Sequence, residues 1–227
     1  MKKRAIWITG ASSGIGKALT IKFAENNFNV IGSARRVERI KQSDRITPVR
    51  NDISNYEDVD KTFSTLQKDF EIECLINNAG TTVFKSFVDT SIDEIERIMK
   101  VNLHGAIYAT KTVLPGMIKR NKGTIINILS VAANTIFTNS TVYSASKAGL
   151  EMFGKVLREE VRDSNIRIIN ILPGATATEI WPEAALKRFS EEMMQPEKLS
   201  DLIFQIYKSD SNLSPEEITI RPIGGDL

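Results

Sequence analysis

The stretch Gly10-Ala-Ser-Ser-Gly14-Ile-Gly16 constrains the fold of this chain more than any other part of the sequence. It follows a short apolar run from Arg4 to Thr9, and Ile15, Leu19 and Phe23 then recur at four-residue steps. This order predicts a strand, a glycine-rich turn and a helix. Glycines allow a tight turn and close approach of a ligand, and the free N–H groups that open a helix attract phosphate. The cluster can be a mere turn, but its place between strand and helix favours a site for a dinucleotide pyrophosphate.

The rest of the chain alternates between short apolar runs and amphipathic stretches. Further strands are expected at residues 29–33, 47–50, 73–76, 124–129, 166–172 and 217–221, and helices at 56–70, 91–100, 101–120, from about 142, at 182–194 and from 196. Such alternation, without a repeat or a linker, predicts an α/β fold in one domain over residues 1–227. The simplest architecture is a doubly wound parallel sheet of six or seven strands with helices on both faces. Pro115 either bends its helix or is accommodated late in it.

Composition excludes several classes of function. The chain has 227 residues and 41% hydrophobic content, which suits one well-filled domain, and its net charge of +2 demands neither a nucleic-acid nor a membrane partner. The apolar run at 5–8 is too short for a signal peptide or a membrane span, so we expect a soluble cytoplasmic protein. A single Cys74 and a single His104 leave no disulfide and no zinc site, and both residues are expected to be structural, with His104 partly buried.

The segment after the second expected strand indicates which dinucleotide is bound. In NAD sites a carboxylate near this strand end holds the adenosine ribose hydroxyls. Here Arg35 and Arg36 follow Ala34 instead. Two guanidiniums are suited to bind a ribose 2′-phosphate, whereas the alternative is a solvated loop. The sequence therefore favours NADP(H) over NAD(H).

Two other segments follow expected strands and therefore belong to the edge where a ligand crevice forms. Asp52 follows the third strand, and it is as suited to cap a turn or helix as to reach adenine. Asn77-Asn78-Ala79-Gly80 follows the fourth strand, where a small tail either ends the strand or lets backbone approach the ligand.

Tyr143 is the candidate acid, and Lys147 is the cation that would activate it. On a shared helix they lie one turn apart, so an ammonium can lower the pKa of a phenol whose ordinary value is about 10. Ser130 ends a near-continuous apolar strand, interrupted only by Asn127, of the kind that is buried on both faces. The Tyr–Lys spacing alone also fits a solvated helix face, and Asn102, on spacing alone, suits a helix-bonding role more often than catalysis.

Taken together, several motifs resemble the classical short-chain dehydrogenase/reductase family. They are Thr9-Gly-Ala-Ser-Ser-Gly-Ile-Gly16, Asn77-Asn-Ala-Gly80, Asn102, Ser130, Tyr143-x-x-x-Lys147 and Pro173-Gly174. The resemblance implies a Rossmann-type fold, a bound NAD(P)(H) and hydride transfer between the nicotinamide and an alcohol or carbonyl carbon. It implies a cofactor site made of Gly10, Ser12, Ser13, Gly14, Ile15, Gly16, Arg35, Arg36, Asp52, Ile53, Asn78, Ala79, Gly80, Tyr143, Lys147, Pro173, Gly174, Thr176 and Thr178.

The resemblance also implies roles for a catalytic quartet. Tyr143 would be the general acid in reduction, and Lys147 would lower its pKa and hold the nicotinamide ribose. Ser130 would orient the substrate oxygen, and Asn102 would hold a water in a proton relay that reaches Lys147. Leu129 and Ala133 stand where the family often has a serine and a glycine, so we expect that the wall of the substrate pocket can differ from that of other members.

These features lead to one favoured function and several alternatives. The favoured function is an NADPH-dependent reductase of a small ketone or aldehyde, with a short lid at about 175–195 and an open, tolerant pocket. The alternatives are a 3-oxoacyl thioester reductase, an alcohol dehydrogenase working in the oxidative direction, and a catalytically silent dinucleotide-binding regulator. An epimerase or dehydratase of the related extended type is disfavoured by the glycine spacing and the short chain. Apolar positions on more than one face of the helix from about 142 predict a homodimer or homotetramer.

Overall fold

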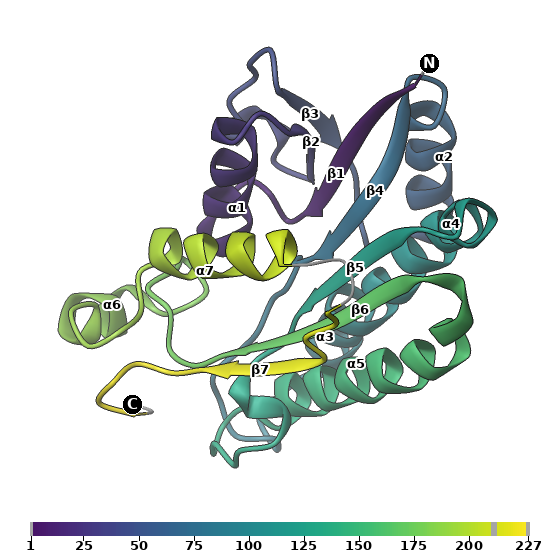
Figure 1. Cartoon of the computed structure of the whole chain (residues 1–227). Helices are drawn as coiled ribbons and strands as arrows, with labels where there is room; N and C mark the ends of the chain where they lie inside the picture. The colour runs from purple at the N-terminus through teal and green to yellow at the C-terminus, as the bar shows by residue number, and fades with distance from the viewer. Residues whose placement is uncertain (1, 210–212, 226–227) are drawn as a thin grey trace.

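The chain folds around one seven-stranded sheet in which every strand pair is parallel, as Figure 1 shows. The computed structural model describes residues 2–209 and 213–225. The strands are β1 (Lys3–Thr9), β2 (Asn29–Ala34), β3 (Ile46–Arg50), β4 (Phe70–Asn77), β5 (Gly123–Ile128), β6 (Ile166–Pro173) and β7 (Glu217–Ile220), in the order β3-β2-β1-β4-β5-β6-β7. The helices are α1 (Gly14–Glu25), α2 (Tyr56–Leu66), α3 (Ile92–Met99), α4 (Gly105–Arg120), α5 (Thr141–Glu160), α6 (Glu183–Phe189) and α7 (Pro196–Lys208). The predicted doubly wound sheet is confirmed.

Helices cover both faces of the sheet, and each face has its own hydrophobic core. Helices α1 and α7 pack on one face, and α2, α4 and α5 pack on the other. Strand β1 supplies both cores, because Ile6 and Ile8 point to the first while Ala5 and Trp7 point to the second. A strand buried on both faces has no solvated side, which explains its continuous apolar run.

The order of the strands reverses at β1, which lies between β2 and β4. The crossovers on the two sides of this point leave the sheet in opposite directions, and a crevice opens beyond the carboxyl ends of the strands. The glycine-rich turn that follows β1 lies at this crevice.

Two predicted helices are shorter than the sequence pattern indicated. Helix α2 ends at Leu66 instead of Phe70, because Phe70 already begins β4 and pairs with Lys3 of β1. The apolar periodicity of the helix continues into Phe70, which is apolar because it belongs to β4. The lid helix expected at 182–194 is the seven-residue α6, and Met194 instead forms an isolated bridge with Thr176.

The two helices expected at 91–120 are joined by a turn of π-helix, Lys100–His104, without a loop between them. Ser91 caps α3 through a reciprocal capping box with Glu94, and Pro115 lies inside α4, which continues to Arg120. Cys74 is buried as expected, but His104 is exposed on the π-turn, so the prediction of a partly buried histidine is wrong. In the described part of the chain, no helix is long and apolar enough to cross a bilayer.

Candidate active site

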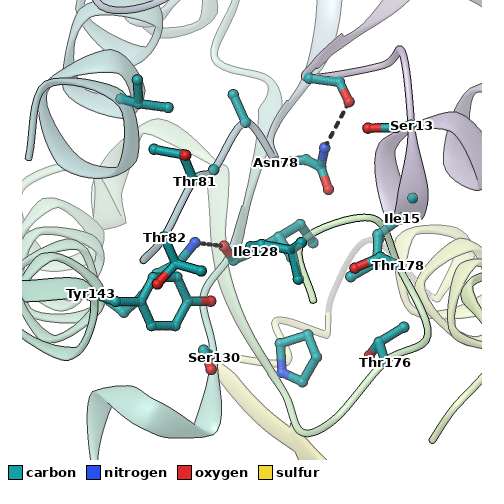
Figure 2. A pocket seen from close by; sticks show the side chains of 18 of the residues that line it. Ser13, Ile15, Asn78, Thr81, Thr82, Ile128, Ser130, Tyr143, Thr176 and Thr178 are labelled. Carbon is teal, nitrogen blue, oxygen red and sulfur yellow. Dashed lines mark hydrogen bonds between the residues drawn. The ribbon is translucent and has the colours of Figure 1, made fainter. Parts of the chain in front are cut away.

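A cavity of about 980 Å³ lies at the carboxyl ends of the strands. It is lined by the glycine-rich turn, by the segments that follow β2, β3 and β4, by Ser130 after β5, by Tyr143 and Lys147 of α5, and by the loop after β6. In Figure 2, Tyr143 and Ser130 lie on one side of the cavity, and Ser13, Ile15 and Thr178 on the other. Of the predicted site residues, all but two line it. The exceptions are Gly16 and Asn102, which act from behind its wall.

The turn after β1 is built to bring backbone close to a ligand. Gly10 and Gly14 have φ angles of +69° and +51°, in the left-handed region that favours glycine. At Gly16 a Cβ would lie 2.3 Å from Asn78 Nδ2 and 2.4 Å from the Gly10 carbonyl oxygen, so only glycine fits there. Ser13, the residue that precedes α1, makes no side-chain capping bond, and the first turn of α1 carries no acidic residue. The start of this helix therefore offers N–H groups and a positive dipole end to an anion.

Asn78 locks this turn against the end of β4. Its side-chain Nδ2 donates to the Thr9 carbonyl oxygen at 2.9 Å, and its backbone N–H donates to Thr9 Oγ1 at 3.1 Å. The loop after β6 closes the other side, because a Cβ at Gly14 would lie 3.0 Å from Thr178 Cβ. Three chain segments thus meet around the predicted phosphate site.

Arg35 and Arg36 are exposed side chains at the rim of the cavity, directly after β2. The structure adds Arg39 and Glu179, two residues that sequence reasoning missed. Arg36 Nη2 lies 4.0 Å from Glu179 Oε2, and Arg39 Nη1 lies 3.2 Å from the same oxygen. Glu179 comes from the loop after β6, so this cluster joins segments 140 residues apart. No local pattern in the sequence signals such a pair.

Asp52 lines the cavity next to Ile53, but its carboxylate is occupied in a turn. Its Oδ1 accepts the Ser54 backbone N–H at 3.0 Å and the Ser54 hydroxyl at 2.7 Å. The residue that caps α2 is Asn55, whose side chain accepts the Asp58 backbone N–H. Of the two interpretations of Asp52, the turn role is therefore visible in the structure, and a contact with adenine stays a prediction.

The Tyr143 ring and the Lys147 ammonium lie on one face of α5, with Nζ 5.8 Å from the ring centroid. Lys147 is buried, and its Nζ donates to the Ile128 carbonyl oxygen at 2.8 Å, the bond drawn as the dashed line at Ile128 in Figure 2. That carbonyl belongs to the last residue of β5, two residues before Ser130. The spacing predicted for the pair is confirmed, and the lysine is held at the strand end that carries the serine.

Burial dominates the titration of both groups. It raises the pKa of Tyr143 above the ordinary value of 10.0, while hydrogen bonding with the Ser130 side chain acts in the opposite direction. Burial also lowers the pKa of Lys147 from 10.5 to about 8. Burial therefore outweighs the influence of the neighbouring groups on the phenol in this structure, and the lowering of the Tyr143 pKa by Lys147 stays a prediction. The ammonium is itself disfavoured by burial and bonds to a backbone carbonyl, so its effect on the phenol is weaker than the cost of desolvating a phenolate.

Asn102 is fully buried and is a positioning residue in this structure. Its Oδ1 accepts the Thr81 backbone N–H at 2.8 Å, and its Nδ2 donates to the Thr81 carbonyl oxygen at 2.9 Å and to Ser146 Oγ at 3.0 Å. These bonds tie the segment after β4 to α5. A Cβ at Gly80 would lie 3.8 Å from both Asn102 Oδ1 and Lys147 Nζ, so the two groups approach the same glycine. The water relay stays a prediction.

A ladder of buried amides lies below the site and was missed by sequence reasoning. Asn77, Asn127 and Asn170 are paired in register on β4, β5 and β6. Asn77 Nδ2 donates to Asn127 Oδ1 at 2.9 Å, and Asn127 Nδ2 donates to Asn170 Oδ1 at 3.0 Å. The ladder packs against Gly154 of α5, where a Cβ would lie 2.4 Å from Asn170 Oδ1. It fixes the three strands whose ends carry the site.

A parallel sheet with a glycine-rich turn at its switch point, and with a serine, a tyrosine and a lysine gathered at the neighbouring strand end, defines a dinucleotide-dependent oxidoreductase fold. The family model described as short chain dehydrogenase matches residues 4–188. The chain therefore belongs to the short-chain dehydrogenase/reductase family and is an oxidoreductase.

Relatives and solved structures agree with this assignment. An uncharacterized oxidoreductase of Staphylococcus aureus strain MW2 is 28% identical over 223 residues, covering 95% of this chain and 96% of its own. Farnesol dehydrogenase of Aedes aegypti is 30% identical over 233 residues, covering 96% and 95%. The closed form of a serine dehydrogenase complexed with NADP+ superposes with a TM-score of 0.92 at 26% identity, covering 98% of this chain and 96% of its own.

Proposed function

We propose that this protein reduces a ketone or aldehyde to an alcohol with NADPH. One observation carries the proposal: Ser130, Tyr143 and Lys147 line the same cavity as the glycine-rich turn and the pair Arg35 and Arg36. A proton donor is thus placed in one continuous space with a site suited to a phosphorylated dinucleotide.

The residues around the cavity fit such a cofactor. The turn at 10–16 has no room for side chains and would bind the pyrophosphate, and Arg35 and Arg36, at the rim of the same cavity, would hold a ribose 2′-phosphate. In the same proposal, Asp52 and Ile53 adjoin adenine, Asn78, Ala79 and Gly80 line the adenosine ribose, and Lys147 holds the nicotinamide ribose. Pro173, Gly174, Thr176 and Thr178 surround the carboxamide. Bound NADPH would supply the hydride.

The chain's own side chains would manage the proton. Tyr143 donates its phenolic proton to the carbonyl oxygen, and Ser130 orients that oxygen by a hydrogen bond. The raised pKa of Tyr143 keeps the phenol protonated at neutral pH but also makes it a weaker acid, so proton donation requires that the phenolate be stabilised as it forms. Lys147 is placed to stabilise the phenolate that forms once the proton has left.

The preference for NADPH rests on the arginines and not on the structural neighbours. The serine dehydrogenase is complexed with NADP+, whereas a 3-ketoacyl-(acyl-carrier-protein) reductase from Brucella melitensis, similar in fold at a TM-score of 0.89, is complexed with NADH. Both cofactors therefore occur on this fold. Arg35 and Arg36 give this chain two guanidiniums at the rim of the cavity, and Arg39 pairs with Glu179 next to them.

Two other reaction assignments share this chemistry, and one assignment belongs to a different class. Reduction of a 3-oxoacyl thioester and oxidation of an alcohol would use the same three residues, and the similarity to farnesol dehydrogenase favours the second of these. A catalytically silent dinucleotide-binding regulator is disfavoured, because it would not require the serine, tyrosine and lysine to gather at one strand end. We place the enzyme in the cytoplasm and expect small-molecule substrates.

The test is a steady-state assay with a panel of diketones, quinones, pterins, aldehydes and 3-oxoacyl thioesters. NADPH oxidation should proceed with at least one carbonyl class, and kcat/KM for NADPH should exceed that for NADH by at least about 10-fold, the value of one good charge-assisted contact. A preference for NADH would contradict the role given to Arg35 and Arg36. If NADPH binds but no carbonyl class is reduced, the catalytically silent regulator is the remaining assignment.

A further inference from the structure

Two aromatic rings stack on each other in the cavity that Ser130 lines. Phe84 and Trp181 are stacked, with ring centroids 5.1 Å apart and planes inclined by 10°, and both line the cavity. Neither residue belongs to the motifs that mark the cofactor or the catalytic groups. Because both rings line the cavity, we expect them to contact the molecule that enters it.

The topology of the sheet explains why the pair lies there. Strands β4 and β6 flank β5 in the sheet, and Phe84 lies in the connection after β4 while Trp181 lies in the connection after β6. The connections that follow the two strands beside β5 thus meet through these rings, in the cavity that Ser130 also lines. Trp181 is also fixed from behind, because its Nε1 donates to the Thr176 carbonyl oxygen at 3.1 Å.

The side chains around this end of the cavity are apolar or neutral. Beside the aromatic pair, the lining contains Leu129, Val131, Ile136, Phe137, Ile180 and the hydroxyls of Thr82 and Thr138. Among the described residues that line the cavity, the charged ones are Arg35, Arg36, Asp52, Lys147 and Glu179. Four of these belong to the dinucleotide end or its rim, and Lys147 is the buried catalytic lysine.

Two further cations in the described part of the chain lie near this wall. Arg97 donates through Nη1 to Thr81 Oγ1 at 2.6 Å, and Thr81 lines the cavity although Arg97 does not. Arg221 donates through Nη2 to Thr135 Oγ1 at 2.9 Å, next to Ile136, but it is not among the residues that line the cavity. Ile136 itself is 95% exposed, an unusual state for an isoleucine at the mouth of a polar active site. The mouth thus presents apolar surface to whatever enters.

We propose that the substrate is an uncharged carbonyl compound with a bulky apolar group next to the carbonyl, and that Phe84 and Trp181 select it. This inference rests on the proposed function and names the substrate class of that site. Burial of an apolar group against two rings is favourable by about 25 cal/mol per Å². A carboxylate in the same place would lose water, and Lys147, the lining cation outside the dinucleotide end, is buried and already bonds to the Ile128 carbonyl oxygen.

The reaction on such a substrate is balanced. The carbonyl carbon accepts a hydride, which carries two electrons, from NADPH, and the carbonyl oxygen accepts the proton of Tyr143. The products are the neutral alcohol, NADP+ and a phenolate that solvent reprotonates. The charge of the organic substrate is zero before and after the step, so the apolar wall never faces a charged species.

A matched pair of ketones tests the inference. 1-Phenyl-1,2-propanedione and benzoylformate share a phenyl ketone, and a neutral acetyl group in the first is replaced by a carboxylate in the second. With NADPH, kcat/KM should be at least about 100-fold higher for the neutral diketone, the cost of burying an unpaired charge. Equal values, or a preference for benzoylformate, would overturn the inference and would point to a cation such as Arg221 reaching the substrate.

Substitutions then assign the selection to the aromatic pair. Phe84→Ala should lower kcat/KM for the neutral diketone by about 10-fold, because about half of an aromatic contact is lost. Phe87→Ala is the matched control, since Phe87 is exposed on the same segment and does not line the cavity, and its kcat/KM should stay within about twofold. Ile136→Arg should raise kcat/KM for benzoylformate. If Phe84→Ala behaves like Phe87→Ala, the pair does not select the substrate.

Binding separates this inference from the proposed reaction. Of the two tryptophans, Trp7 is fully buried and stacks on Phe63, so quenching of fluorescence by a ketone reports on Trp181, and Trp181→Phe removes the signal. The neutral diketone should quench the NADP+-loaded protein and benzoylformate should not. If this holds while NADPH is never oxidised, the substrate class stands and the proposed reaction fails. If both ketones quench alike, or only benzoylformate does, the substrate class is wrong.

Discussion

The buried ammonium of Lys147 is the clearest sign that one residue of this chain is placed for chemistry at a cost in stability. Its side chain is 3% exposed, and its Nζ bonds to a neutral carbonyl instead of a carboxylate. Burial lowers its pKa from 10.5 to about 8, which corresponds to roughly 3 kcal/mol of unfavourable free energy for the charged form. A core position chosen for stability alone would not hold this group.

We predict that Lys147→Met increases the free energy of unfolding by about 2 kcal/mol at neutral pH, since the cost of the buried charge is removed and one hydrogen bond is lost. Because the folded pKa is below the unfolded one, the unfolded chain binds more protons between pH 8 and 10.5. The wild type therefore gains stability as pH rises through this window, and the advantage of the variant should shrink there. Urea unfolding at a series of pH values checks this. A variant that is less stable than the wild type at pH 7 would contradict it.

Site residues whose relative position is set within one helix could be predicted from the sequence, whereas contacts between distant segments could not. Tyr143 and Lys147 are predictable because a helix fixes the relation between positions four apart. The contact of Glu179 with Arg36 and Arg39 is not, because it depends on where a loop after the sixth strand folds back. The raised pKa of Tyr143 could not be predicted from the sequence either, because the spacing shows the nearby cation but not how deeply both groups are buried.

Among the elements, the three central strands β4, β5 and β6 show how register creates a feature that no single strand reveals. Asn77 ends β4, while Asn127 and Asn170 interrupt the apolar runs of β5 and β6. Only the pairing of Asn77 with Asn127 and of Asn127 with Asn170 makes these residues a ladder. The strands themselves could be predicted from their apolar runs. The end of α2 could not, because its apolar positions run on into β4.

We predict that Asn127→Ala lowers the free energy of unfolding by about 2–4 kcal/mol, because it leaves buried groups of Asn77 and Asn170 without their partner. Asn134→Ala, at an exposed position directly after the short helical turn Val131–Ala133, should change it by less than about 0.5 kcal/mol. Urea titration of both variants provides the comparison. Equal midpoints for the two variants would show that the ladder adds nothing to stability.

The loop after β6 places a carboxylate on the arginines that are proposed to hold the 2′-phosphate. We predict that Glu179→Gln tightens NADPH binding by about 3-fold and leaves NADH nearly unchanged, because an exposed ion pair of about 0.5–1 kcal/mol no longer competes with the phosphate. Glu183→Gln is the control, since Glu183 pairs with Lys187 on α6 instead. Fluorescence titration measures the affinities of the wild type and of both variants for NADPH and for NADH. Weaker NADPH binding in Glu179→Gln would mean that the carboxylate orients the arginines and does not compete.

At the scale of the whole molecule, α5 presents apolar surface on the side away from the sheet. Met152 is 59% exposed and Val156 is 51% exposed, and they lie one turn apart. We predict a homodimer or homotetramer in which this face is covered, and a folded monomer for Met152→Glu combined with Val156→Glu. Sedimentation at micromolar concentration distinguishes the species. A wild type that sediments as a monomer would contradict the prediction.

The central claim is that Tyr143 protonates a carbonyl beside bound NADPH, and one comparison tests it most directly. Tyr143→Phe keeps the ring and removes only the proton that is donated, so kcat should fall by at least about 1,000-fold, within the range of a lost general acid. The dissociation constant of NADPH should stay within about threefold, because the phosphate turn and the arginines are untouched. Retained turnover in Tyr143→Phe would contradict the account.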